Sequence, residues 1–269
     1  MNASLRPAAV AGMFYPGSAA VLSHDIAQML SLTARKQVLR PKAVIVPHAG
    51  YIYSGPVAAS IYAPLVALRD VVRRVVLLGP THRFAVNGLA LPSATAFATP
   101  LGNVPIDKQA VAAIMDLPQV IVSDAAHAQE HSLEVQLPFL QTVFDEFSLL
   151  PLAVGHASAE AVCEVLERLW GGDETLIVVS SDLSHYLPYH TARQVDSGTA
   201  RRILDLDYAI DHEMACGATP INGLLLAARK HGLQGQLLDL RNSGDTAGDK
   251  SRVVGYGAFA FHRAEFDAQ

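Results

Sequence analysis

Several short runs of apolar residues along the chain have the length of buried strands. They are Ala43–Val46, Val75–Leu78, Phe147–Val154, Leu176–Ser180 and Val253–Phe261. Within these runs the apolar residues are continuous and do not alternate with polar ones, which indicates strands that are covered on both faces. The pattern therefore predicts a largely parallel sheet enclosed by helices.

Segments with helical periodicity separate most of these strands. They are Pro56–Arg69, Asp107–Met115, Ser132–Phe144, Ala157–Trp170, Thr191–Leu204 and Pro220–His231. Gly88–Ile106 is rich in small residues and proline, and we expect extra strands or a long loop there. No linker, low-complexity segment or fixed repeat divides the sequence. We therefore predict an α/β fold in which residues 1–269 form a single domain, with a central, largely parallel mixed sheet flanked by helices.

Composition and charge narrow the classes of function. The chain has 269 residues, 51% of them hydrophobic, and a net charge of −5. No basic block is present, so nucleic acid is not an expected partner. No apolar run approaches the roughly 18 to 20 residues of a membrane-spanning helix, so we expect no membrane association. The N-terminal residues MNASLRPAAVAGMFYPG make a poor secretory signal, so a cytoplasmic location is expected.

Residue types that bind metals or move protons follow three of the expected strands. His48 follows the first strand, His82 follows the second, and Asp182 and His185 follow Leu176–Ser180. Open α/β sheets form their sites in the crevice beyond the carboxyl ends of parallel strands. Each histidine alone could be structural, and Asp182 alone could cap a turn. The recurrence at one place in three strands favours a common site.

A further polar group, made of Glu130, His131 and Glu134, stands at the start of an expected helix. An acidic residue there can simply stabilise the positive end of the helix. Alternatively, Glu130 and His131 line the pocket and orient the metal ligands or the substrate. The sequence does not decide between these two interpretations.

The two cysteines differ in their surroundings. Cys216 precedes a helix that starts near Pro220, and because a thiol at a helix N-terminus has a lowered pKa, we expect a soft metal ligand or a nucleophile there. Cys163 falls on an amphipathic helix, where core packing is expected. The polar loop Arg241–Arg252 has Asp249 where a P-loop needs its second glycine, and a strand follows it, so ATP or GTP chemistry is not expected.

Seven motifs, in order along nearly the whole chain, resemble the MEMO protein family, whose prokaryotic members are labelled protein B of the AmmeMemoRadiSam system. They are AGMFYPG, VPHAGYIYSG, LLGPTHR, EHSLEVQLPFL, VVSSDLSHY, ACGATPI and NSGDTAGDKSRVVGYGAFAF. The resemblance implies a fold similar to that of class III extradiol dioxygenases, which use non-haem iron. It also implies that His48, His82 and Cys216 bind the metal, that His185 is the acid–base histidine, and that Asp182 is its close neighbour.

The resemblance leaves the metal and the activity open. A thiolate in place of the carboxylate of an iron dioxygenase shifts the preference toward copper(I), zinc or a differently tuned iron, so we expect iron or copper, with zinc as an alternative. Tyr51, in the same motif as His48, is expected beside the substrate with Glu130 and His131.

Three classes of function are consistent with such a site. The first is metal-dependent oxidation of an unknown small-molecule substrate. The others are a non-enzymatic binding, scaffold or metal-handling role with a vestigial site, and a metal-dependent hydrolase. The resemblance further implies a radical-SAM protein and an AMMECR-type protein as partners.

Overall fold

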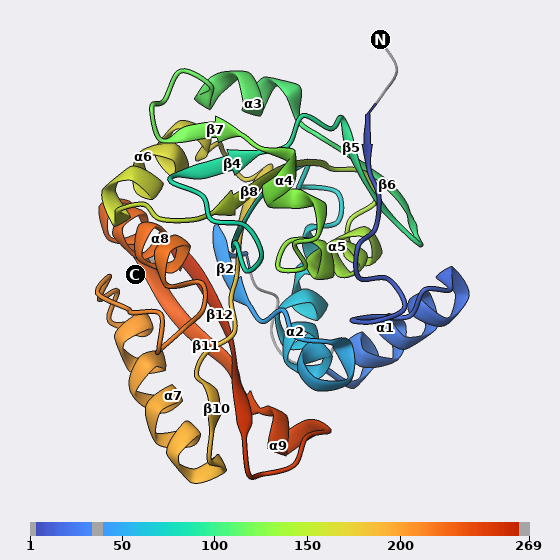
Figure 1. The fold of residues 1–269 in the computed structure, drawn as a ribbon, viewed down its shortest axis with the longest axis vertical. Helices are drawn as coiled ribbons and strands as arrows, with labels where there is room; N and C mark the ends of the chain where they lie inside the picture. The colour runs from blue at the N-terminus through green and yellow to red at the C-terminus, as the bar shows by residue number, and fades with distance from the viewer. Residues whose placement is uncertain (1–3, 34–39, 264–269) are drawn as a thin grey trace, which may run out of the picture.

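A large mixed sheet lies between two layers of helices in the computed structural model, which describes residues 4–33 and 40–263 (Figure 1). Its strands are β2 Ala43–Val46, β3 Arg74–Pro80, β4 Leu89–Leu91, β7 Val120–Val122, β8 Ser148–Val154, β9 Thr175–Ser180, β10 His185–Leu187, β11 Leu233–Asn242 and β12 Val253–Arg263. Their order is β10-β12-β2-β9-β3-β8-β4-β7, and β11 pairs with β12. The central strands β2, β9, β3 and β8 are parallel, whereas β12 runs antiparallel to β2.

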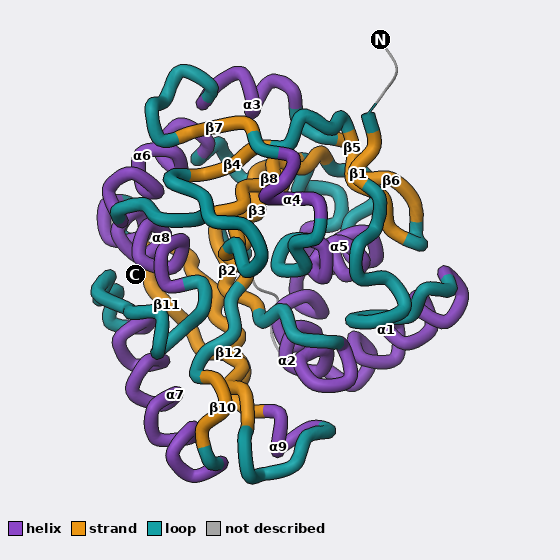
Figure 2. Tube along the Cα trace, viewed as in Figure 1, coloured by secondary structure: helices purple, strands orange, loops and turns teal. Residues whose placement is uncertain are grey.

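A smaller sheet and the helices complete the fold (Figure 2). The smaller sheet has the order β1-β5-β6 and consists of β1 Leu5–Arg6, β5 Ala96–Thr99 and β6 Gly102–Pro105. The helices are α1 Ala19–Thr33, α2 Tyr51–Leu65, α3 Lys108–Ile114, α4 Asp124–Ala128, α5 Leu137–Val143, α6 Ala159–Leu169, α7 Tyr189–Leu204, α8 Ala218–Lys230 and α9 Ser243–Thr246, with 3-10 turns η1 Val66–Leu68 and η2 Glu134–Gln136.

Successive residues of the central strands face two different cores, which explains their continuous apolar sequences. In β2, Val44 and Val46 pack in the core that contains α1, α2 and α5. Ala43 and Ile45 pack in the opposite core, which contains α3, α6, α7 and α8. Because both faces of each strand are covered, a polar residue on either face would be buried. Cys163 is also fully buried in the second core, so its expected packing role is confirmed.

The expected α/β architecture is confirmed, and several details differ from the expectation. The last expected strand, β12, is antiparallel and forms a long hairpin with β11, which the sequence did not indicate. Most residues of β11 are only half-buried, so it lacks the apolar run of a central strand. Helix α1 was missed for a similar reason, since only Leu22 and Ile26 in it are buried. Gly88–Ile106 does contribute extra strands, namely β4, β5 and β6.

The expectation that no apolar run approaches a membrane-spanning length was wrong. The helical stretch Tyr51–Leu68 has 18 residues and a mean hydropathy of 1.3. Within the fold, 61% of that stretch is buried, and much of it belongs to the first core. Packing between the sheet and α1 therefore accounts for its apolar sequence.

Candidate metal centre

The carboxyl ends of β2, β9 and β3 meet at one edge of the sheet. The register pairs Val46 with Ser180 and Leu78 with Val179, so the three strands end at similar heights. The chain leaves β2 at Pro47–His48, β9 at Ser181–Asp182 and β3 at Thr81–His82. The expected convergence of polar strand endings is therefore present in the fold.

Three imidazoles come together there, and their metal-binding nitrogen atoms all lie within 4.8 Å of one another. The ring centroids of His48 and His82 are 5.2 Å apart, and His131 stands 5.3 Å from His48 and 4.6 Å from His82. His48 is buried at 2% exposure, His131 is half-buried and His82 is exposed. The cluster thus opens to solvent on the His82 side.

The hydrogen bonds of Ser180 fix the protonation state of His48. The Ser180 hydroxyl donates its one hydrogen to the Ser132 carbonyl (2.6 Å) and accepts a hydrogen from Gln136 Nε2 (2.8 Å). His48 Nδ1 lies 3.0 Å from the same oxygen, so it must be the donor. Burial holds the pKa of His48 well below its usual value. His48 is therefore neutral, with the lone pair of Nε2 free for a metal ion.

Glu130 orients His82 in a similar way. One carboxylate oxygen of Glu130 accepts from His82 N (2.6 Å), and the other lies 2.9 Å from His82 Nδ1. The backbone N–H groups of His131 and Ser132 also donate to this carboxylate, at 2.9 Å each. Although burial opposes ionisation, these donors hold the pKa of Glu130 at about 2. The carboxylate that fixes Nδ1 leaves Nε2 of His82 for a ligand, which supports the orienting role for Glu130 over simple helix stabilisation.

Cys216 contacts the cluster at His48, since its Sγ lies 3.2 Å from His48 Nε2. Two ligands of one tetrahedral ion stand about 3.5 Å apart, so this pair of atoms could share an ion, but Cys216 is not in the group whose ligand atoms all lie within 4.8 Å of one another. The expected low thiol pKa is wrong. Burial and the nearby Asp182 raise the pKa of Cys216 to about 12, and they outweigh the start of α8. A cation would therefore be needed to ionise this sulfur.

Asp182 and His185 stand at the same edge of the sheet. Asp182 Oδ1 accepts from His48 N at 2.7 Å, and burial raises the pKa of Asp182 to about 7. His185 Nδ1 lies 2.9 Å from the Leu183 carbonyl, so Nδ1 carries the hydrogen and Nε2 is an acceptor. Burial lowers the pKa of His185.

Tyr51 is close to the site, but its hydroxyl is engaged elsewhere. It donates to the Val135 carbonyl at 2.7 Å, and its ring packs against Phe139 with centroids 5.0 Å apart. Burial raises the pKa of Tyr51 well above its usual value. In this structure Tyr51 therefore braces the segment that carries His131 and does not offer its hydroxyl to a ligand.

Glu134 has a different task from its neighbour Glu130. Its carboxylate is fully buried and forms an ion pair with Arg6. It also accepts from the backbone N–H groups of Ala9 (2.8 Å) and Val10 (3.0 Å) and from the Tyr15 hydroxyl (2.6 Å). Glu134 therefore fixes the N-terminal segment against the segment that carries the site.

Sequence reasoning missed the residues that support the metal-binding histidines. Ser180 and Gln136 orient His48, and Phe14 packs on His131 with ring centroids 4.6 Å apart. Ser180 and Gln136 lie inside the motifs VVSSDLSHY and EHSLEVQLPFL, so their position in those motifs was the available signal. Phe14 likewise lies inside the motif AGMFYPG, but its contact with His131 joins segments that are distant in sequence.

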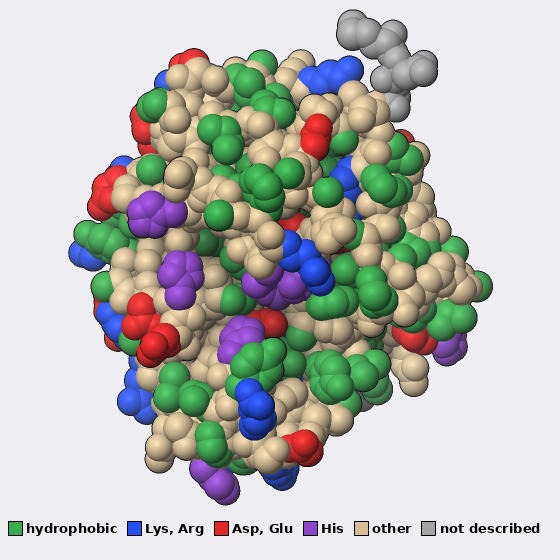
Figure 3. Space-filling model, in the orientation of Figure 1, with side chains coloured by type: hydrophobic (Ala, Val, Ile, Leu, Met, Phe, Trp, Pro, Cys, Tyr) green, Lys and Arg blue, Asp and Glu red, His purple; other side chains and the backbone are tan. Residues whose placement is uncertain are grey.

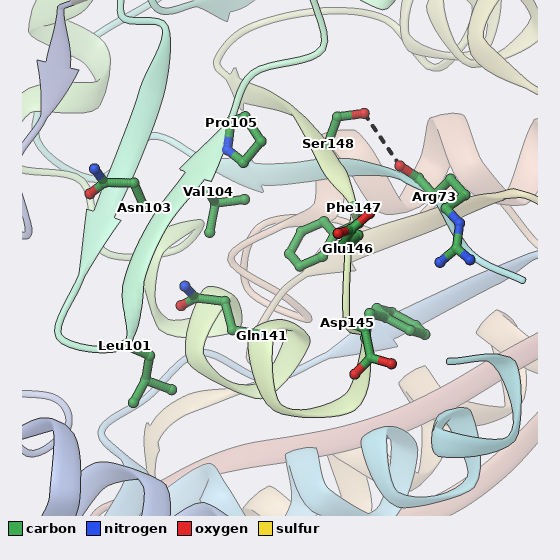
Figure 4. A pocket seen from close by; sticks show the side chains of 11 residues that line it. Arg73, Leu101, Asn103, Val104, Pro105, Gln141, Asp145, Glu146, Phe147 and Ser148 are labelled. Carbon is green, nitrogen blue, oxygen red and sulfur yellow. Dashed lines mark hydrogen bonds between the residues drawn. The ribbon is translucent and has the colours of Figure 1, made fainter. Parts of the chain in front are cut away.

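A separate cavity of about 590 Å³ lies at the amino ends of β3 and β8 (Figure 4). Its lining includes Arg73, Val104, Gln141 and Phe147. The lining contains no histidine or cysteine. This cavity therefore offers no imidazole or thiolate ligand to a metal ion.

Comparisons with known proteins place the chain in a family. A family model described as "Memo-like protein" matches residues 6–260. A "MEMO1 family protein" of Aquifex aeolicus is 38% identical over 264 residues, covering 94% of this chain and 97% of the relative. Another, from Metallosphaera sedula, is 38% identical over 231 residues, covering 81% and 82%. An uncharacterized protein of Escherichia coli K12 has a TM-score of 0.49 and 13% identity, covering 80% of this chain and 98% of that one, which is too weak a likeness to assign a fold. The chain belongs to the MEMO family.

Proposed function

We propose that this protein binds one redox-active metal ion, iron or copper, and uses it for metal-dependent oxidation of a small molecule. His48, His82 and His131 would hold the ion, and Cys216 would approach it from the His48 side. The observation that carries the proposal is the cluster of three imidazoles with donor atoms within 4.8 Å of one another. The bonds from Ser180 and Glu130 support it further, because they direct Nε2 of His48 and His82 away from their anchoring groups.

The donor set fits these metals. Imidazole nitrogen suits iron, copper and zinc, and a thiolate adds preference for copper(I) or zinc. The bound ion would supply redox or Lewis-acid chemistry. Asp182 and His185 would handle protons, because the pKa of Asp182 is about 7 and Nε2 of His185 carries no hydrogen.

A hydrolase is the second candidate, because three histidines around zinc also form a water-activating site. Glu130 is a poor base for this chemistry, since four N–H groups already occupy its carboxylate. Asp182, with a pKa of about 7, is the better base. The identity of the metal therefore separates the two reactions.

We also propose a cytoplasmic location and association with a radical-SAM protein and an AMMECR-type protein, as the family resemblance implies. Co-purification of tagged protein from cell extract tests both proteins as partners. A non-enzymatic role in metal handling would show a filled site with no turnover of any substrate.

Metal analysis tests the proposal directly. Protein purified without added metal is stripped with a chelator, reloaded anaerobically with iron(II), copper or zinc, and measured by elemental analysis and competition titration. We expect one ion per chain, and we expect His48→Gln to weaken binding at least about 100-fold. His190→Gln, which changes an exposed histidine on α7, is the matched control and should bind as the wild type does.

Two further variants distinguish the donors. Loss of affinity in both His131→Gln and Cys216→Ser means that both residues are ligands, and loss in one of them alone assigns the remaining position. Oxygen uptake is then followed with candidate substrates. A chain that takes up no metal under any of these conditions refutes the proposal, whereas a filled site without oxygen uptake leaves only the oxidation unsupported.

A further inference from the structure

Large apolar side chains are exposed around the opening of the metal centre. Ile52 is 68% exposed and lies in the first turn of α2, just after the His48 loop. Phe84, two residues after His82, is 47% exposed. Tyr186, next to His185, is 62% exposed. An apolar rim around a polar centre is typical of a binding site.

The backbone at Tyr186 supports a specific placement of its ring. Tyr186 has a φ of 59°, which lies in the left-handed region that bulky side chains rarely adopt. Its ring stands 5.8 Å from the ring of His185. Strained conformations of this kind persist where the surrounding structure imposes them, and they concentrate at functional sites.

Two arginines add positive charge to the same opening. Arg83 follows His82 directly and is exposed. The guanidinium of Arg252 lies 5.0 Å from the centre of the Tyr186 ring. Figure 3 shows the same composition on one face, where histidines near the middle adjoin a basic side chain and hydrophobic side chains.

No carboxylate is placed to neutralise these arginines. Neither Arg83 nor Arg252 forms an ion pair with a carboxylate in the described part of the chain. Carboxylates in the neighbouring loops already have hydrogen-bond donors: Glu130 is buried and bonded to four N–H groups, Asp182 is buried and accepts from His48 N, and Asp249 accepts from Ser251. Arg83 and Arg252 are therefore available to an anionic ligand, and a bound metal ion would add positive charge beside them.

We propose that the substrate of this centre is an organic anion that carries an apolar body of several carbon atoms. Its carboxylate or phosphate group is attracted by Arg83 and Arg252. Its hydrocarbon part packs against Ile52, Phe84 and Tyr186. This inference rests on the proposed function, because it assigns a substrate class to the same metal centre.

A set of matched probe ligands tests the two parts of this recognition separately. Binding of acetate, hexanoate and hexanol is measured by calorimetry on metal-free and on zinc-loaded protein. Hexanoate and acetate differ in the apolar body, whereas hexanoate and hexanol differ in the charge. We expect hexanoate to bind about tenfold more tightly than acetate and about fivefold more tightly than hexanol.

Two variants assign these preferences to residues. Arg83→Gln should remove most of the preference for hexanoate over hexanol, and Phe84→Ser should reduce the preference for hexanoate over acetate. Arg73→Gln is the control, since Arg73 is also exposed and without an ion-pair partner among the described residues, but lies at the opposite end of the sheet. It should leave both preferences unchanged.

The outcomes separate this inference from the proposed function. Equal binding of the three probes, or preferences that survive both variants, overturns the inference while metal binding stands. Preferences that depend on Arg83 in the metal-free protein support it even if no metal binds. Loss of preference in the Arg73→Gln control would show non-specific binding of anions and would also overturn it.

Discussion

The hydroxyl of Ser180 is the most informative atom to remove, because it is fully buried and has a partner at each of its three bonding positions. In Ser180→Ala, His48 Nδ1–H, one N–H of Gln136 and the Ser132 carbonyl each lose a partner. An unsatisfied buried polar group costs about 1 to 3 kcal/mol. We therefore expect the metal-free variant to lose about 3 kcal/mol or more of unfolding free energy.

The same change should weaken metal binding. Without the Ser180 oxygen, neither the tautomer nor the ring orientation of His48 is fixed, and losing such a supporting bond typically reduces metal affinity about 10- to 100-fold. Urea unfolding of metal-free protein measures the first effect, and titration against a competing chelator measures the second. Ser132→Ala is the control, since its hydroxyl donates to the Pro80 carbonyl and bonds no histidine among the described residues. It should cost about 1 kcal/mol and leave metal affinity nearly unchanged.

Wild-type metal affinity in Ser180→Ala would refute the argument that this hydroxyl sets the protonation state of His48. Equal stability losses in the two variants would show that the three bonds of Ser180 do not act together. Either result would mean that the hydrogen bonds of Ser180 are not what holds His48 in its place in the histidine cluster.

Three further predictions follow from the buried groups. The pKa of Glu130 is about 2 in the folded protein, below its ordinary value of 4.5. The stabilisation from its carboxylate is therefore present above about pH 4.5 and is lost as the pH falls toward 2. Urea unfolding should show that Glu130→Gln destabilises the protein by about 3 kcal/mol at pH 6 and by much less at pH 3. Burial raises the pKa of Asp196 from 3.8 to about 6, so the wild-type protein loses stability as the pH rises between these values. Asp196→Asn should therefore be more stable than the wild type by about 2 kcal/mol at pH 8 and equally stable at pH 4. A stability gain that does not depend on pH would contradict this. A methyl group at Gly223 would overlap the side chain of Val162, where α8 packs against α6. Gly223→Ala should therefore reduce the free energy of unfolding by more than about 2 kcal/mol and lower the melting temperature measured by circular dichroism. An unchanged melting temperature would mean that the two helices move apart without loss of stability.

The central sheet could be predicted from sequence because its strands are buried on both faces. The expected Ala43–Val46 coincides with β2, and the expected strands at Val75–Leu78 and Leu176–Ser180 fall within β3 and β9. By contrast, β11 and α1 each present a mostly half-buried or exposed surface, so their apolar signal is weak. The antiparallel direction of β12 is set by its hairpin with β11 and could not be read from β12 alone.

The sequence predicted which strand ends carry the candidate site, but it did not predict how all of the side chains meet there. The strand endings located His48, His82 and Asp182 at one edge, because parallel neighbours end together. The closeness of His131 to the other imidazoles depends on how the Glu130–Gln136 segment folds back over β3, which local pattern does not encode. The prediction of a low thiol pKa for Cys216 was wrong for the same reason. The start of a helix can be recognised in the sequence, whereas burial beside Asp182 cannot.

The buried carboxylate of Glu134 determines when the N-terminal segment can form its native contacts during translation. Arg6 and Tyr15 leave the ribosome more than a hundred residues before Glu134, so their contacts with its carboxylate cannot form until Glu134 has been synthesised. A ribosome that stalls before codon 134 would therefore release a chain in which Arg6 and Tyr15 lack this acceptor.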